Sequence, residues 1–220
     1  MTDDTLRRSA SVSGGIFAVT FFVGLLLVGD QAGAFADSER AYTEIFSDDS
    51  HRNEDVAGSL LLIVSALSLG TFAHQLAASG DATQPWSVVT RVGGTLASVS
   101  ILMAGAAFLT VPASLLFGEF TGDPGLVTAQ PVLPHFGYIL LVVGSTIPAG
   151  ALMVASTRLS GFPTWLRWLT VVAAVLLVVT GQSVITMLLL PIWVATVSLV
   201  TRRVAQIPDT RSNEHLTDRP

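Results

Sequence analysis

Carboxylates and histidines gather around residue 50 in a pattern that could hold a divalent cation. Within eight residues the chain carries Asp48, Asp49, His51, Glu54 and Asp55. Carboxylate oxygens and imidazole nitrogens bind Ca²⁺, Mg²⁺ or Zn²⁺ when a fold brings several of them together. A metal site is therefore the most specific chemical hypothesis that this segment allows.

Three residues far away in the sequence could join this cluster, namely Glu119, Asp123 and His135. The same groups could also transfer protons, with His51 or His135 beside an acid, in a membrane enzyme that acts on a lipid at the outer face. However, the spacing matches no diagnostic ligand pattern, and acids are common at helix starts because they favour the positive end of the helix dipole. We therefore prefer a solvated loop that leads into a helix capped by Asp49 or Ser50, without metal, cofactor or catalytic residues.

The composition excludes several classes of protein. The 220 residues include no cysteine and no lysine, which excludes thiolate metal sites, Schiff-base lysines and the lysine of a phosphate-binding loop. A net charge of −5 argues against a nucleic-acid partner. Half of the residues are hydrophobic and only 12% are charged, against about 25% in soluble domains. This composition predicts a membrane protein. The sequence also lacks a nucleophile–base–acid set and the HExxH and GxSxG motifs, so we expect that it is not an enzyme.

Five apolar runs are long enough to cross a membrane, since a helix needs about 20 apolar residues to span a hydrocarbon core of about 30 Å. They cover residues 14–29, 56–78, 92–117, 133–157 and 168–201, and none contains Asp, Glu, Lys or Arg. Ion-coupled transporters usually carry ionisable residues at membrane depth, so this absence argues against one.

The last run is too long for one crossing. From Leu166 to Arg203 it would form about 57 Å of helix at 1.5 Å per residue. Its one polar, glycine-containing break is Thr180-Gly181-Gln182-Ser183. We therefore predict two helices joined by a tight turn there, which makes six spans in an all-α transmembrane bundle.

The arginines support this count, because cytoplasmic loops are enriched in positive charge. With six spans and a cytoplasmic N-terminus, nine arginines lie inside and only Arg40 and Arg52 lie outside. The nine are Arg7, Arg8, Arg91, Arg158, Arg167, Arg202, Arg203, Arg211 and Arg219. Five spans would export the last four and remove the bias. We therefore expect a multi-pass protein of the plasma membrane with both termini in the cytoplasm.

This topology divides the chain into three parts: a cytoplasmic segment 1–13, a bundle 14–203 and a disordered cytoplasmic tail 204–220. The acidic extracytoplasmic loop 30–55 is expected to carry a short amphipathic helix around Tyr42. Arg7-Arg8, the first apolar run and Ala34-Phe35-Ala36 also fit a cleaved signal peptide. That run is long for a signal peptide, so we favour an uncleaved anchor.

Inside the bundle, His74 and His135 fall near opposite faces of the membrane, so they are not expected to ligate one haem. Pro148 lies near mid-membrane, where Ser145 and Thr146 could satisfy the groups it frees. It favours a static kink over a gating hinge. Trp193 is expected to pack against a neighbouring helix.

Small residues are dense in the third and fourth runs, for example Gly93, Gly94, Gly105, Gly144 and Gly150. They allow close packing of helices within the bundle, a dimer contact or a ligand groove, and the sequence does not decide between these.

Trp165 and Trp168, on either side of Arg167, are expected to anchor the fifth span at the inner interface.

Three short motifs resemble a broad group of largely actinobacterial multi-span membrane proteins that is defined only as a domain of unknown function. They are Ser50-His51-Arg52-Asn53 before the second span, Pro163-Thr164-Trp165-Leu166 before the fifth, and Leu190-Pro191-Ile192-Trp193 before a run that closes at Arg202-Arg203. The resemblance covers most of residues 14–203 and implies a fold and a location but no reaction.

Function is predicted by exclusion. The leading hypothesis is a non-catalytic accessory or structural membrane component, in contact with lipid and with other membrane proteins or further copies of itself. A carrier or pore for a small neutral or lipophilic molecule is the first alternative. The lipid-directed membrane enzyme is the second.

Overall fold

The structure is a computed structural model that describes residues 3–29, 49–79, 84–117, 124–159, 162–180 and 184–204. All regular structure in these ranges is helical, which confirms the predicted all-α class. The elements are α1 (Asp3–Leu27), α4 (Asp49–Ala78), α5 (Pro85–Phe117), α6 (Pro124–Ile139), the π-helix η2 (Leu140–Gly144), α7 (Ser145–Ser156), α8 (Thr164–Thr180), α9 (Val184–Met187) and α10 (Leu189–Val204).

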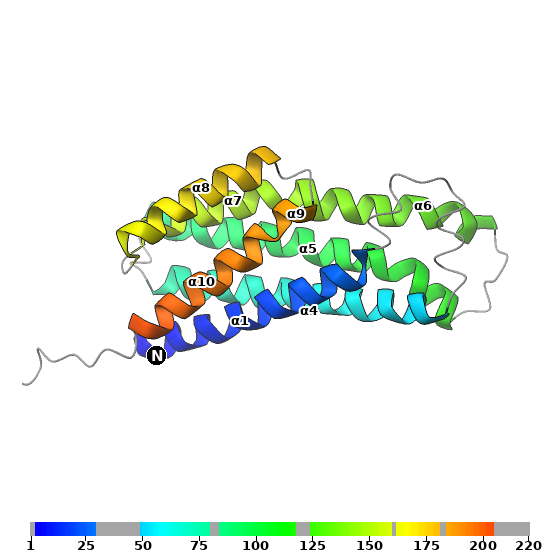
Figure 1. The fold of residues 1–220 in the computed structure, drawn as a ribbon, viewed down its shortest axis with the longest axis horizontal. Coiled ribbons are helices and arrows are strands. Elements are labelled where there is room, and N and C mark those ends of the chain that lie inside the picture. The colour runs from blue at the N-terminus through cyan, green and yellow to red at the C-terminus, as the bar shows by residue number, and fades with distance from the viewer. Residues whose placement is uncertain are drawn as a thin grey trace, which may run out of the picture.

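The helices run side by side along the long axis of an elongated bundle (Figure 1). α4 lies between α1 and α5, and α6, η2 and α7 form one continuous rod along α5. α8 covers α7, and α10 packs on α1. We call the end where α1 begins and α10 finishes the arginine end, because it holds Arg8, Arg91, Arg158, Arg167 and Arg202. The opposite end, where α4 starts at Asp49, is the acidic end.

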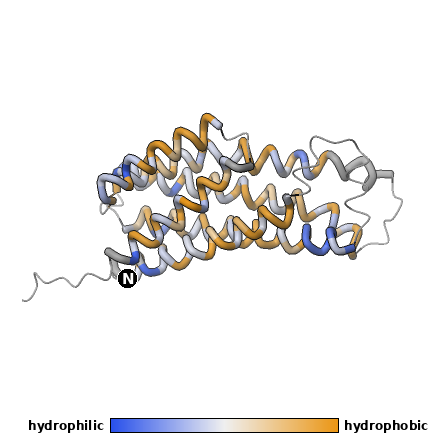
Figure 2. The backbone as a smooth tube through the Cα atoms, viewed as in Figure 1, coloured by the Kyte–Doolittle hydropathy of each residue, from blue (hydrophilic) through white to orange (hydrophobic). Residues whose placement is uncertain are grey.

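Four helices are long and apolar enough to cross a membrane, within Arg8–Leu27, Asp49–Ala78, Pro85–Leu116 and Val132–Ser156. Apolar residues dominate the middle of the bundle and hydrophilic residues lie toward its two ends (Figure 2). Many large apolar side chains point outward, among them Leu26, Ile147 and Val179. Because a soluble surface rarely exposes so much apolar area, length, composition and surface all indicate a helical membrane protein.

The last apolar region is interrupted after Thr180, as predicted, and again at Leu188 between α9 and α10, which the sequence did not predict. α8 ends at Thr180 and the next helix begins at Val184, while residues 181–183 lie outside the described ranges. α8 has 17 residues and α10 has 16, so each is about 25 Å long and shorter than the four long helices.

Five of the helices, α1, α4, α5, α6 and α8, begin earlier than the apolar runs they contain. α1 begins at Asp3 and therefore includes most of the segment 1–13 predicted to precede the first span. α5 begins at Pro85, where proline is well tolerated because the first helical residue needs no amide hydrogen bond. An apolar run shows only which part of a helix can lie in the hydrocarbon core. The helix itself extends further, because backbone hydrogen bonding does not require apolar side chains. The predicted loop helix in 30–48 and the tail beyond Val204 lie outside the described residues.

Glycines lie where helices cross closely. A Cβ atom on Gly93 would come within 2.8 Å of the Pro148 carbonyl oxygen on α7, and one on Gly94 would overlap Ala73 on α4. Gly24 and Gly58 face each other where α1 crosses α4, since a Cβ on either would lie 2.9–3.0 Å from the other's carbonyl oxygen. The small residues therefore pack helices within the bundle.

Polar side chains also join neighbouring helices. The Ser98 hydroxyl on α5 donates to the Ala66 carbonyl on α4, and the Ser87 hydroxyl donates to the Ala77 carbonyl at 2.8 Å. Each bond ties a hydroxyl to a backbone oxygen, which is favourable where no water competes.

Trp193 packs as the sequence predicts. It is buried, meets the Phe72 ring edge-on at 6.2 Å and donates from Nε1 to the Thr170 hydroxyl on α8 at 2.9 Å. One side chain of α10 thus contacts both α4 and α8. The predicted anchors Trp165 and Trp168 are exposed on α8 at the arginine end.

Candidate functional site

The predicted metal cluster forms the first turns of α4 rather than a loop. α4 begins at Asp49, and Asp49 pairs with Arg52 one turn later. His51 Nδ1 lies 3.9 Å from a Glu54 carboxylate oxygen. The side chains of Asp49 and Glu54 are exposed, as expected for acids at the start of a helix, where the dipole favours negative charge.

Asp55 does not fit the predicted solvated segment, because its side chain is buried. Only 2% of the residue is exposed, and it is the one charged residue among the buried polar residues in the described part of the chain. Ser59 follows one turn later and is also buried. The buried stripe continues through Leu62 and Ala66, so extending the helical period backward from the apolar span would have placed Asp55 on the buried face.

The remaining predicted ligands are not drawn into one site. Among residues 3–29, 49–79, 84–117, 124–159, 162–180 and 184–204, no three His, Asp or Glu side chains are grouped closely enough to hold a metal ion. His135 lies on α6, a different helix from His51. Asp48, Glu119 and Asp123 lie outside the described ranges. The metal hypothesis thus finds no ligand set in the part that the structure describes.

His74 lies near the end of α4, at the arginine end, whereas His135 lies on α6 toward the acidic end (Figure 1). The two histidines are therefore on opposite halves of the bundle, as the sequence predicts. His74 is exposed and lines a surface groove of about 500 Å³ between α4 and α5, together with Gln75 and Thr95. A haem iron cannot bridge imidazoles placed this far apart.

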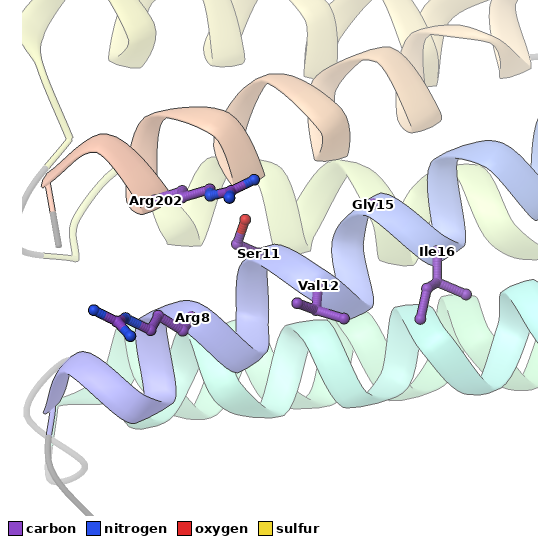
Figure 3. A pocket seen from close by; sticks show the side chains of 6 residues that line it. All are labelled: Arg8, Ser11, Val12, Gly15, Ile16 and Arg202. Atoms are coloured by element: carbon purple, nitrogen blue, oxygen red, sulfur yellow. The ribbon is translucent and has the colours of Figure 1, made fainter. Parts of the chain in front are cut away.

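The most distinctive site lies at the arginine end, in a cavity of about 450 Å³ between α1 and α10. It is lined by Arg8, Ser11, Val12, Gly15 and Ile16 from α1 and by Arg202 from α10. Figure 3 shows the Arg202 side chain extending above Ser11, whose hydroxyl is directed toward it. Arg8 precedes Ser11 by about one helical turn and its guanidinium points toward the start of α1, so the two guanidinium groups lie at different places along this end of the cavity (Figure 3).

A second cavity, of about 310 Å³, lies between the same two segments of the chain, nearer the middle of the bundle. Its lining is almost wholly apolar and consists of Ala18, Val19, Phe22, Val23, Leu188, Pro191, Ile192 and Ala195. Leu188, Ala195 and Arg202 are seven residues apart, so they share one face of the chain leading through α10. We call the two cavities together the α1–α10 groove.

Helix packing beside the groove sets its shape. A Cβ on Gly14 would collide with the Ser198 hydroxyl, so the missing side chain lets α10 approach α1 near the arginine end. Val12 and Val19, on the outer side of α1, are more than 60% exposed. The groove therefore opens on the outer surface of the bundle.

The lining of the α1–α10 groove is chemically complementary to an anionic amphiphile. Guanidinium groups form charge-assisted hydrogen bonds with phosphate and carboxylate oxygens, and the apolar part offers surface to a hydrocarbon chain. In the sequence, Arg8 and Arg202 indicated only the topology. The spacing of seven residues between Leu188, Ala195 and Arg202 is typical of one helical face, but no local pattern predicts that α10 packs on α1.

No family model matches the chain, and no curated protein or solved structure is significantly similar to it. Function must therefore be argued from the residues and their geometry.

Proposed function

We propose that this protein is a six-span component of the plasma membrane, with both termini in the cytoplasm and an accessory or structural role that involves no catalysis. In this proposal the arginine end faces the cytoplasm and the acidic end faces outward. Of the six arginines whose side chains the structure describes, five lie at the arginine end, and Arg52 lies at the other. This asymmetry supports the orientation because positive charge is retained on the cytoplasmic side.

α8 and α10 supply the fifth and sixth spans in this proposal. Each is about 25 Å long, close to the hydrocarbon thickness of about 30 Å, and the two run in opposite directions. Most of α8 is exposed apolar surface, including Val172, Val175 and Val179. Lipid is the natural environment for such a surface.

The main support for an accessory role is that interior glycines and hydroxyl groups make contacts within and between the helices. Gly93 and Gly94 bring α5 against both α7 and α4. Ser98 and Ser87 donate to backbone carbonyls of neighbouring residues in α4, and Ser65 donates to a carbonyl of its own helix at 2.7 Å. These groups hold helices together, which is what a rigid structural component requires.

The carrier hypothesis is less well supported, because the cavities open on the surface. The grooves lined by α1 with α10 and by α4 with α5 each lie between two neighbouring helices. A carrier needs a path along the bundle. Reconstituted protein is expected to leave glycerol and urea permeation of liposomes unchanged in stopped-flow light scattering, and faster permeation would favour the carrier.

The lipid-directed enzyme remains the third hypothesis. His51 Nδ1 and a Glu54 carboxylate oxygen, from the predicted proton-transfer set, lie 3.9 Å apart on exposed turns of α4. The resemblance to actinobacterial multi-span proteins likewise stays a prediction and adds no reaction.

Topology can be tested with single cysteines, because the natural chain has none. Ser38→Cys is expected to react with a membrane-impermeant maleimide in intact cells, whereas Thr83→Cys and Ser212→Cys should react only after permeabilisation. Labelling of Ser212→Cys in intact cells would contradict the six-span count. Each variant is checked for labelling after solubilisation, so that a buried thiol is not mistaken for a cytoplasmic one.

The accessory role is tested by affinity purification of the full chain in mild detergent, followed by mass spectrometry. The expected result is the same co-purifying membrane protein, or a second copy of the chain, in independent preparations and after cross-linking in cells. An unrelated six-span protein expressed at the same level is the control. A chain that is recovered alone and monomeric in every preparation would contradict the proposal.

A further inference from the structure

We propose that the α1–α10 groove is a binding site for an anionic phospholipid of the inner leaflet. Its phosphate lies between Arg8 and Arg202, and one acyl chain follows the apolar part of the groove. The proposal rests on the membrane placement proposed above.

The headgroup end of the groove is strongly basic. Among the described residues, its lining contains two guanidinium groups, the Ser11 hydroxyl and no carboxylate. Each arginine offers several N–H donors, and the two come from different helices, with the Arg202 side chain over Ser11 and the Arg8 guanidinium directed toward the start of α1 (Figure 3). A phosphodiester between them would therefore join the start of α1 to the end of α10, as basic pockets between membrane helices do with anionic headgroups.

The remainder of the groove matches a hydrocarbon chain. Ile192 and Ala195 on α10, with Leu188 just before it, line the cavity away from Arg202, and Val19 and Phe22 line it from α1. Arg202 and Leu188, at the far ends of the two cavities, are 14 residues apart, or about 21 Å at 1.5 Å per residue, which exceeds one leaflet of a core about 30 Å thick. A soluble anion would leave this apolar length uncovered, so the groove favours a lipid.

A second basic groove at the arginine end serves as a comparison. It lies beside α8, has about 310 Å³ and is lined by Thr157, Arg158, Thr164, Arg167, Trp168 and Val171. Its arginines already have protein contacts, since Arg158 lies over the Trp86 ring at 5.6 Å and Arg167 Nε donates to the Phe162 carbonyl at 3.1 Å. We therefore place the phospholipid in the α1–α10 groove.

The test is native mass spectrometry of the purified full chain in micelles that contain equal amounts of phosphatidylglycerol and phosphatidylcholine. We expect retained phosphatidylglycerol on the natural chain. In the double variant Arg8→Gln/Arg202→Gln, retention is expected to fall by about tenfold or more, since each arginine near a membrane surface adds about a fivefold preference for anionic lipid. The matched control Arg158→Gln/Arg167→Gln removes the same charge and should keep most of the bound lipid.

Equal losses in the two double variants would overturn the proposal, because they would show general attraction to a basic end rather than a site. Unchanged retention in Arg8→Gln/Arg202→Gln would overturn it too. Thermal unfolding gives a second readout, since a ligand of the folded state raises the melting temperature. Phosphatidylglycerol should raise the melting temperature of the natural chain and of the control variant, and leave that of Arg8→Gln/Arg202→Gln unchanged.

The source of the phosphate is tested by competition with glycerophosphoglycerol, which has the same headgroup and no acyl chains. It should fail to displace phosphatidylglycerol at equal concentration. Efficient displacement would instead indicate a site for soluble phosphodiesters. Micelles have no sidedness, so this result is independent of the cysteine-labelling result on topology and of the co-purification result on accessory function.

Discussion

The Ser100 hydroxyl on α5 donates a hydrogen bond of 3.0 Å to the Gly144 carbonyl oxygen, at the end of the π-helix η2. In a regular helix this oxygen would accept from the amide four residues later, but that residue is Pro148, which has no N–H. A side chain from a neighbouring helix therefore replaces the missing donor.

Ser145 and Thr146, which the sequence suggested as substitutes near Pro148, bond elsewhere. The Ser145 hydroxyl donates to the Leu141 carbonyl, and the Thr146 hydroxyl donates to the Val143 carbonyl at 3.3 Å. Because the Ser100 hydroxyl on α5 serves this carbonyl, the contact favours a fixed arrangement at Pro148; the static kink and the hinge both stay hypotheses.

Ser100→Ala is expected to lower the free energy of unfolding by about 1 kcal/mol, because it leaves the Gly144 carbonyl oxygen without the Ser100 donor. Unfolding in mixed micelles of mild detergent and dodecyl sulfate measures the change. Ser114→Ala on the same helix is the control, since the Ser114 hydroxyl bonds its own helix at the Thr110 carbonyl, and it should change stability by less than about 0.5 kcal/mol.

Pro148→Ala restores an amide donor in the rod formed by α6, η2 and α7. In this background, Ser100→Ala should cost less than in the natural chain, because the new N–H can serve the Gly144 carbonyl. The measurement is a double-mutant cycle on the free energy of unfolding. Strictly additive effects would show that Ser100 and Pro148 are not coupled.

Gly94→Ala is expected to destabilise the fold by about 1–3 kcal/mol, because the new methyl group would overlap Ala73 where α4 and α5 cross. The same substitution at Gly15 meets no atom within 4 Å and should be neutral or stabilising by up to about 1 kcal/mol, since alanine favours helix more than glycine. Melting temperatures in one detergent compare the two variants. A similar loss in both would refute the close-crossing explanation.

Trp193→Phe tests the polar contact between α10 and α8. It removes the indole N–H that bonds Thr170 and retains an aromatic ring beside Phe72, so we expect a loss of about 1 kcal/mol. Trp168→Phe alters a tryptophan that is 70% exposed on α8 and should change stability by less than about 0.5 kcal/mol. Equal effects of the two changes would mean that the hydrogen bond contributes nothing.

Asp55→Ala and Glu54→Ala compare a buried acid with its exposed neighbour. Asp55 is enclosed by the bundle, so its removal disturbs polar groups that water cannot reach, and we expect a loss of about 1–3 kcal/mol in the free energy of unfolding. Glu54→Ala should cost less than about 0.5 kcal/mol, because the carboxylate is half exposed. Indistinguishable unfolding curves would argue against a structural role for Asp55.

Local sequence features were enough to predict the helical class, the break after Thr180, the separation of His74 from His135 and the burial of Trp193. Each of these follows from the length of an apolar run or from the type of a single residue at its position in the sequence. The six-span topology, by contrast, is still a prediction to be tested by labelling.

Only the tertiary structure decided which distant residues meet. Three features depend on how each helix is rotated about its axis and where it crosses its neighbours: the pairing of Ser100 with Gly144, the burial of Asp55 and the presence of Arg8 and Arg202 in the lining of one cavity. Rotation and crossing are set by packing over the whole bundle, through glycines such as Gly94 and Gly14. Hydropathy is a property of neighbours along the chain, so it identifies the helices but leaves their mutual orientation open.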